Sequence, residues 1–345
     1  MIQIRQLTQS LSRFSGLLLL VMLAAACARQ TALVHPTPSF TILHLTDTHL
    51  CQLDRYHPTL IEKRKHYGKG HDPLKRVLTV QTRKIGADAV VVTGDVVDFY
   101  EGTTAKGDLR AGQIEYFAPL AGRAHVPLWL VLGNHDISTH AVNEKAESKT
   151  AQLRAQMARA AWIRQIRCFR EGTYYYRDVQ VGAASWRLYF LDNAYRLTGD
   201  PAGNLWDRPQ LDWLENELNQ LSGRKAILFF HIPLPVGDTN GDGVSFPPPP
   251  KGWPFPDSYE KGVFKILNEH PSVVAAFVGH NHKNIIEDIP LPSGHKITQV
   301  ETGAFAAAPT NWRAITLTEN AVAISKPGDL AVEKTIELRT ASWRK

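Results

Sequence analysis

The 345-residue chain has few cysteines, no long run of one charge and no apolar run of membrane-spanning length. Its three cysteines are too few for a small domain built on disulfides. Its 39 basic and 33 acidic residues give a formal charge of +6 but interleave along the chain, so the basic excess identifies no partner. A chain of this length with 43% hydrophobic residues buries a sizeable core without a structural metal. We therefore expect an ordinary globular protein in which any metal serves chemistry.

The first 26 residues have the order of a secretory signal, with two arginines, an apolar run and three alanines that precede Cys27. The apolar run is shorter than the ~20 residues of a comfortable membrane span, which speaks against a retained transmembrane anchor. The segment Leu23–Cys27 resembles a bacterial lipobox with its leucine one place early. We therefore predict that residues 1–26 are a signal peptide and that the protein is exported, either to the periplasm or lipid-anchored through Cys27 in the bacterial envelope. Loss of this segment, which has two arginines and no acid, would lower the formal charge from +6 to +4.

The next residues, 27–39, have little apolar periodicity and end in a proline-containing stretch, which predicts an extended tether with an unpaired backbone. No internal repeat and no long linker follows, so residues 40–345 are predicted to form one domain. Within it, the proline- and glycine-rich segment 233–256 is predicted to be a long irregular loop.

Short apolar runs rich in Val, Ile, Leu and Phe alternate with stretches of helical spacing, which predicts an α/β fold. The predicted strands are 40–46, 89–93, 127–132, 186–191, 226–230, 273–278, 314–318 and 335–338. The predicted helices are 72–85, 114–120, 143–166, 209–221 and 258–267.

Polar residues of metal-binding types follow five of these strands. Carboxylate, imidazole and amide groups suit a metal site of mixed nitrogen and oxygen donors. Open α/β sheets bind ligands at the carboxyl ends of their strands, and capping roles alone would not gather such residues at all five ends. The candidates, in chain order, are Asp47, His49, Asp95, Asp98, Asn134, His135, His231, His280 and His282.

The order of the motifs resembles the calcineurin-like metallophosphoesterase family over residues 40–302: D-x-H, G-D-x-x-D, G-N-H-D, a lone His and G-H-x-H. The resemblance implies an α/β fold of the α+β sandwich type, with two mixed β-sheets flanked by helices in four layers. It also implies a two-metal site at one edge of the sandwich. The activity that it implies is hydrolysis of a small phosphodiester or phosphomonoester by metal-activated water.

Each predicted ligand takes a role from this resemblance. It implies that one metal is held by Asp47, His49 and His282, that the other is held by Asn134, His231 and His280, and that Asp95 bridges the two. The ligand types suit two divalent or trivalent ions, Mn, Fe or Zn, and do not choose among them. Two such ions would clamp the phosphoryl oxygens and supply hydroxide near neutral pH.

Two further residues are predicted to be catalytic. By resemblance, His135 protonates the leaving alkoxide or stabilises charge, and Asp98 is placed to orient that imidazole. A supporting hydrogen bond for His135 and a turn cap for Asp98 are the structural alternatives. Asp98 also stands where the purple acid phosphatase branch has a tyrosine, which disfavours a purple iron site.

Two other functions stay open. A nuclease of the same family would need a basic groove, and the basic residues after the first motif (Lys63, Arg64, Lys65, Lys69, Lys75 and Arg76) are more typical of a solvated surface. Nucleic acid is therefore not the expected partner. A surface lipoprotein that binds a ligand on an inactive scaffold is the third hypothesis, and the presence of every predicted ligand speaks against it.

Overall fold

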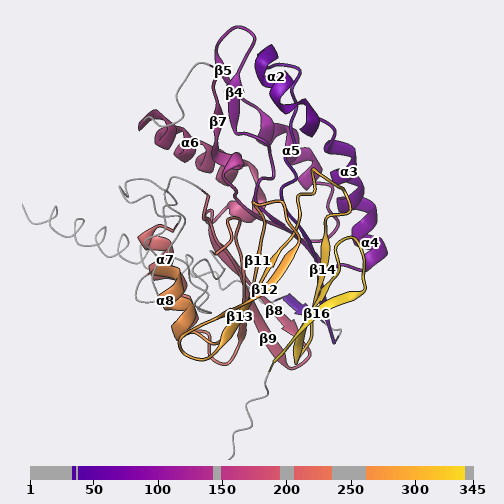
Figure 1. Ribbon diagram of the computed structural model, residues 1–345, viewed down its shortest axis with the longest axis vertical. Helices are drawn as coiled ribbons and strands as arrows, with labels where there is room; N and C mark the ends of the chain where they lie inside the picture. The colour runs from indigo at the N-terminus through magenta and orange to yellow at the C-terminus, as the bar shows by residue number, and fades with distance from the viewer. Residues whose placement is uncertain (1–32, 36–37, 143–148, 195–205, 235–261, 339–345) are drawn as a thin grey trace, which may run out of the picture.

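The structure, a computed structural model, consists of two facing β-sheets with helices on both outer faces (Figure 1). It describes residues 33–35, 38–142, 149–194, 206–234 and 262–338. The predicted signal peptide, Cys27 and nearly all of the predicted loop 233–256 lie outside these residues. None of the helices that are described is long and apolar enough to cross a membrane.

The first sheet has seven strands and is mixed. In spatial order its strands are β1 (Leu33–His35), β8 (Tyr175–Val181), β9 (Ala184–Phe190), β10 (Lys225–Phe229), β11 (Val273–Val278), β13 (Lys296–Glu301) and β12 (Ile285–Pro290). The four central strands, β9, β10, β11 and β13, run parallel. β8 pairs antiparallel with β9 and parallel with β1, and β12 pairs antiparallel with β13. A parallel centre is buried on both faces, which explains the continuous apolar runs that predicted β10 and β11.

The second sheet has six strands and is also mixed. In spatial order its strands are β16 (Val332–Glu337), β15 (Ala321–Ser325), β14 (Arg313–Leu317), β2 (Phe40–Leu45), β3 (Ala89–Thr93) and β6 (Leu128–Val131). The strands β2, β3 and β6 are parallel, and β14, β15 and β16 continue the sheet antiparallel.

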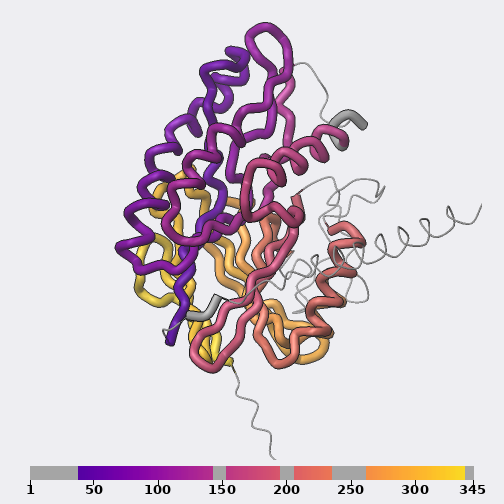
Figure 2. Tube along the Cα trace, turned by 180° about the vertical axis from the view of Figure 1, so that it is seen from behind, coloured from indigo at the N-terminus to yellow at the C-terminus, as the bar shows by residue number. Residues whose placement is uncertain are grey.

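Helices cover the outer face of each sheet (Figures 1 and 2). The helices are α2 (Pro58–Arg64), α3 (His71–Arg76), α4 (Thr82–Ile85), α5 (Gln113–Ala121), α6 (Lys149–Gln165), α7 (Arg208–Asn219) and α8 (Gly262–Glu269). Apolar residues of α3, α5 and α6 pack in one core cluster with the six-stranded sheet, whereas those of α7 and α8 pack against the seven-stranded sheet. The helix–sheet–sheet–helix arrangement confirms the predicted fold.

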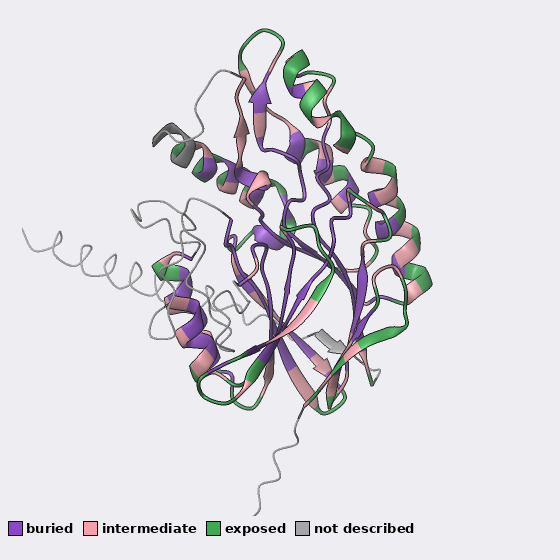
Figure 3. Cartoon of the chain, in the orientation of Figure 1, coloured by how far each residue is buried: buried purple, intermediate pink, exposed green. Residues whose placement is uncertain are grey.

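Aromatic side chains fill the space between the two sheets. Phe229 stacks on Phe190 at 5.2 Å and on Phe277 at 5.4 Å between ring centroids, across three neighbouring strands. Trp129 of β6 lies 5.6 Å from the Phe190 ring and so joins the two sheets. Each such side chain contributes roughly 1.5–3 kcal/mol by its burial, and Figure 3 shows the strands of this interior as buried along most of their length.

A third, small sheet lies at the end of the sandwich beyond the ends of β3 and β6 (Figure 1). Its strands are β5 (Leu109–Ala111), β4 (Glu101–Thr103) and β7 (Thr139–His140). Together with α2 it surrounds a separate apolar cluster that includes Cys51, Tyr56 and Phe99. The sequence did not predict this sheet, because strands of two or three residues are too short to show an alternating pattern.

Several local predictions were wrong. Residues 33–35 were predicted to be an unpaired tether, but they form β1 and pair in parallel with β8. The strands β8, β12, β13 and β15 were also missed, since all four have polar or small residues that interrupt an apolar run. By contrast, the helix predicted over 72–85 is confirmed to within one residue: it spans 71–85 and includes a π-helical turn, Val77–Gln81, that the sequence did not predict.

Candidate metal centre

The carboxyl ends of five parallel strands meet at one edge of the sandwich. Backbone bonds join the turn after β2 to the turn after β3, from Asp47 N to Gly94 O (3.0 Å) and from His49 N to Asp95 O (2.9 Å). The turn after β11 approaches the same place, because His280 N donates to Asp47 Oδ2 at 3.0 Å. The residues predicted from five separate strand ends are thus gathered at one place.

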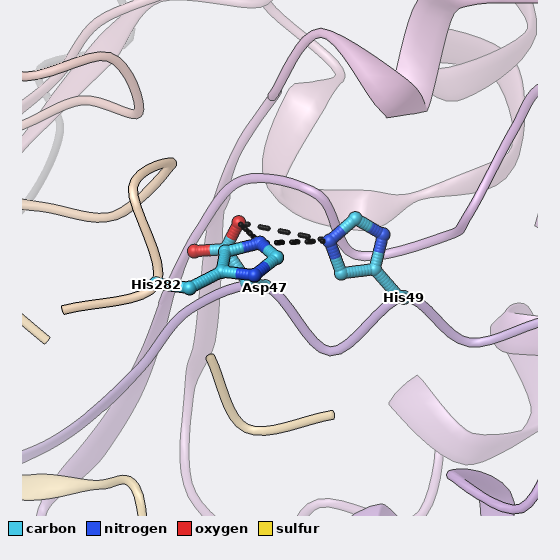
Figure 4. Close-up of side chains that lie close together, drawn as sticks. All are labelled: Asp47, His49 and His282. Atoms are coloured by element: carbon cyan, nitrogen blue, oxygen red, sulfur yellow. Dashed lines mark hydrogen bonds and ion pairs between the residues drawn. The ribbon is translucent and has the colours of Figure 1, made fainter. Parts of the chain in front are cut away.

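The first group consists of Asp47, His49 and His282 (Figure 4). Asp47 Oδ1 lies 3.2 Å from Nε2 of His282 and 3.8 Å from Nε2 of His49, and these two nitrogens are 3.3 Å apart. The other oxygen of Asp47 accepts from Thr46 Oγ1 at 2.6 Å. Oδ1 is buried and has no hydrogen-bond partner within the described part of the chain, and the three candidate ligand atoms lie within 4.8 Å of one another.

The second group consists of Asp95, Asn134, His231 and His280. Asp95 Oδ2 lies 3.3 Å from His231 Nε2, and Asn134 Oδ1 lies 3.0 Å from His280 Nδ1. His231 Nδ1 is 2.8 Å from the backbone oxygen of Thr93, and its Nε2 is buried without a hydrogen-bond partner among the residues that the structure describes. Asp95 Oδ2 is also 3.7 Å from Nε2 of His49 in the first group, so this carboxylate lies between the two groups.

The charges of the site fit bound cations. Asp47 and Asp95 are fully buried, and no Lys or Arg within the described ranges forms an ion pair with either. Burial alone would raise the pKa of Asp95, but the imidazoles of His231 and His135 hold it well below its usual range. Burial would lower the pKa of His231, but the charge of Asp95 outweighs burial and raises it to about 10. Buried carboxylates need a paired cation or a metal, and the mixed donors suit ions such as Mn, Fe or Zn.

The backbone at these turns is unusual. Six described residues other than glycine have a positive φ, and five of them are predicted metal ligands. L-residues rarely adopt this conformation, and it persists only where the surrounding structure imposes it, often at functional sites. The five ligands are Asp47, His49, Asp95, His280 and His282.

The glycines of the motifs make room for the ligands. A Cβ on Gly133 would lie 2.2 Å from Asp95 Oδ1, and a Cβ on Gly279 would lie 2.4 Å from Asp47 Oδ2. Real Cβ atoms do not approach other atoms so closely, so both positions require glycine for close approach. The motif glycines therefore fix where the two carboxylates stand.

His135 and Asp98 lie beside the second and first groups respectively. The backbone amide of His135 donates to Asp95 Oδ1 at 2.8 Å, and its ring Nδ1 is 2.7 Å from the backbone oxygen of Asp98. The Asp98 carboxylate lies 3.0 Å from Nδ1 of His49 and 3.7 Å from that of His135. The structure therefore gives Asp98 a closer partner than the predicted one: its side chain contacts His49, a predicted metal ligand, and its backbone oxygen contacts His135.

Sequence reasoning missed residues that hold the ligands in place. Asn193 Oδ1 accepts from the backbone amides of His231 and Ile232, both at 3.0 Å, and fixes the turn after β10. Asp192 forms an ion pair with Arg159 of α6 at 2.7 Å. Asp192 and Asn193 follow directly after the predicted strand 186–191, so the rule that polar residues gather after strand ends could have found them.

Comparison with known proteins agrees with this geometry. The family model of the calcineurin-like phosphoesterases matches residues 40–284. The chain belongs to this family. The predicted family and the predicted fold are thereby confirmed, and the five motifs that carry the predicted metal ligands lie within the matched residues.

Two curated calcineurin-like relatives are diesterases. The chain is 26% identical over 205 residues to a glycerophosphodiester phosphodiesterase of Enterobacter lignolyticus, covering 56% of each protein. It is 33% identical over 108 residues to a cAMP/cGMP dual specificity phosphodiesterase of Mycobacterium tuberculosis, covering 31% of this chain and 30% of that protein. The matches thus span little more than half of one relative and less than a third of the other.

A solved structure shares the calcineurin-like fold. A dimetal phosphatase from Danio rerio superposes with a TM-score of 0.53 at 15% identity, covering 87% of this chain and 99% of that one. At this identity the likeness shows the fold alone.

Proposed function

We propose that the protein is an exported, dinuclear-metal phosphoesterase that hydrolyses a small phosphate ester, with a phosphodiester as the favoured substrate. The observation that carries the proposal is the pair of ligand groups with one buried carboxylate, Asp95, between them. The activities of the two curated relatives support a diester rather than a monoester.

Two cations held by these groups, Mn, Fe or Zn, would supply Lewis-acid stabilisation of the phosphoryl oxygens and a nucleophile from water. The chain's own residues would then hold the proton donor in place and protonate the leaving alkoxide. His135 is fixed through Nδ1 by the backbone oxygen of Asp98, and its side chain is 24% exposed beside the ligands. Its Nε2 has no hydrogen-bond partner among the residues described, and it is the atom we assign to proton donation to the leaving alkoxide.

The test uses the metal-reconstituted protein with bis(p-nitrophenyl) phosphate as the diester and p-nitrophenyl phosphate as the monoester. Asp95→Asn is expected to lower turnover of the diester by at least about 10³-fold and to lower the metal content, with an unchanged circular dichroism spectrum. Asp72→Asn is the matched control, because that carboxylate is 91% exposed and pairs with His71, which is not a predicted ligand. Unchanged turnover in Asp95→Asn, or no hydrolysis by the wild type at any metal loading, would reject the proposal.

Export and lipid attachment at Cys27 form the remaining part of the proposal, and they rest on the basic, apolar and small-residue order of residues 1–27. Expression of the full chain in a bacterium is expected to place it in the envelope fraction, labelled by radioactive palmitate. Cys27→Ser should abolish the label. A full-length, unlabelled protein in the cytoplasm would contradict this part without bearing on the metal site.

A further inference from the structure

Arg64, the last residue of α2, turns inward from a stretch of surface charges. Its neighbours Lys63 and Lys65 are exposed, whereas the Arg64 side chain is only 18% exposed. Its Nε donates to Asp98 Oδ2 at 2.6 Å, and its Nη2 donates to Asp98 Oδ1. The planar fork of the guanidinium thus engages both oxygens of a fully buried carboxylate. A residue predicted to belong to a solvated surface is therefore an internal partner.

Asp98 also contacts a predicted metal ligand, His49. Oδ1 of Asp98, which Arg64 already holds, lies 3.0 Å from Nδ1 of His49. A carboxylate paired with an arginine offers only acceptor atoms, so Nδ1 of His49 has to carry the ring proton. Nε2 of His49 then presents a lone pair towards the group formed with Asp47 and His282, which is the form that binds a metal.

The same short segment also fixes the plane of the His49 ring. Tyr67, which ends the 3-10 turn after α2, stacks on His49 at 4.4 Å between centroids and 12° between planes. The Arg64 guanidinium carbon lies 4.9 Å from the centre of the Tyr67 ring. The residues that follow the first motif therefore hold one ligand by its ring nitrogen and by its ring face.

We infer that Arg64 is a positioning residue of the metal centre: through Asp98 it sets the tautomer of His49 and so the affinity of the Asp47–His49–His282 site. The inference rests on the proposed two-metal function. The fork requires a carboxylate, because an amide at position 98 would turn its NH₂ group either towards Arg64 or towards His49. One of the two contacts would then oppose a donor with a donor.

The experiment has two readouts, neither of which needs turnover. In chelator-treated protein with ¹⁵N-labelled histidine, the His49 signals, assigned by their loss in His49→Asn, should show the Nδ1–H tautomer. Arg64→Gln removes the fork that fixes both oxygens of Asp98, so the carboxylate is free to turn away from Nδ1 of His49. A mixture of the two tautomers, or the opposite tautomer, is therefore expected in this variant. Metal competition against a chelator should then show one site weakened about 10–100-fold and the other unchanged within about threefold.

Arg55→Gln is the matched control, because Arg55 is also near the first motif in the sequence but its side chain is 57% exposed and forms its ion pair with Asp54, which is exposed as well. It should behave as wild type in both readouts. Asp98→Asn, which preserves size, is measured in parallel and decides the question if Arg64→Gln does not fold. A wild-type tautomer together with wild-type affinity at both sites, in whichever of the two variants folds, would overturn the inference.

The outcomes separate this inference from the proposed function. A wild-type protein that binds two metals but hydrolyses no ester would reject the proposed function. The tautomer and the affinity of the first site would still decide the role of Arg64.

Discussion

His44 gives the fold a dependence on pH that can be calculated. It lies fully buried in β2, with Nδ1 3.0 Å from Thr302 Oγ1 and Nε2 2.8 Å from Thr93 Oγ1. Burial is the main cause that lowers its pKa, from 6.5 to about 3, and the nearby charge of Arg313 lowers it further, while Asp47 raises it. The folded protein therefore holds this imidazole neutral across the physiological range.

The unfolded chain takes up a proton at His44 below pH 6.5, and the folded chain does not until about pH 3. Stability from this group is therefore complete above pH 6.5 and is lost as the pH falls, by about 1.4 kcal/mol per pH unit. Between pH 8 and pH 5 the loss from His44 alone amounts to about 2 kcal/mol.

The assay is urea unfolding of the chelator-treated protein at pH 8 and at pH 5, so that release of metal does not contribute. The free energy of unfolding of wild type should fall by about 2 kcal/mol more than that of His44→Gln, whose amide can bond to both hydroxyls but does not titrate. Other groups titrate in both proteins and cancel in the comparison. An equal fall in the two proteins would refute the reasoning.

Three further predictions follow from packing. Gly133→Ala should cost most of the bound metal and the activity, because the new Cβ would lie 2.2 Å from the carboxylate between the two groups, whereas Gly122→Ala, whose nearest contact is 3.7 Å, should retain both. Asn193→Ala should lower the free energy of unfolding by about 2–4 kcal/mol, since it leaves two buried amides without an acceptor; a loss below 1 kcal/mol in urea unfolding would contradict this. Burial raises the pKa of Cys51 to about 12 and that of Cys168 to about 11, so in a Cys27→Ser background neither thiol should react with Ellman's reagent at pH 8 until the protein unfolds, and fast labelling of the native protein would disprove their burial.

The sequence was informative where a class of residue has a single structural role, such as apolar residues in a buried strand. The buried strands β10 and β11 are continuous apolar runs, and the ligands follow directly after them, so both could be located without coordinates. The rule of polar residues after a strand end worked because parallel strands bring those ends to one edge of the sheet.

The sequence was uninformative where the partner of a side chain decides its role. Arg64 stands among exposed lysines, and only the fold shows that it turns towards Asp98. Asp98 itself was predicted to orient His135, yet its carboxylate is nearer to His49, because tertiary packing brings the two strand ends together. The strands of the small sheet and β1 are too short for any pattern to show.

The turns that carry the predicted ligands restrict the residue at each position in two ways, by its metal-binding group and by its backbone conformation. Five predicted ligand positions have a left-handed backbone, and aspartate and histidine are among the few residues other than glycine that adopt it readily. Glutamate or cysteine could coordinate a metal at these positions but would fit the backbone less well. A designer who transplants this centre would therefore have to copy the turns together with the side chains, because the backbone of the turns itself limits which residue types fit.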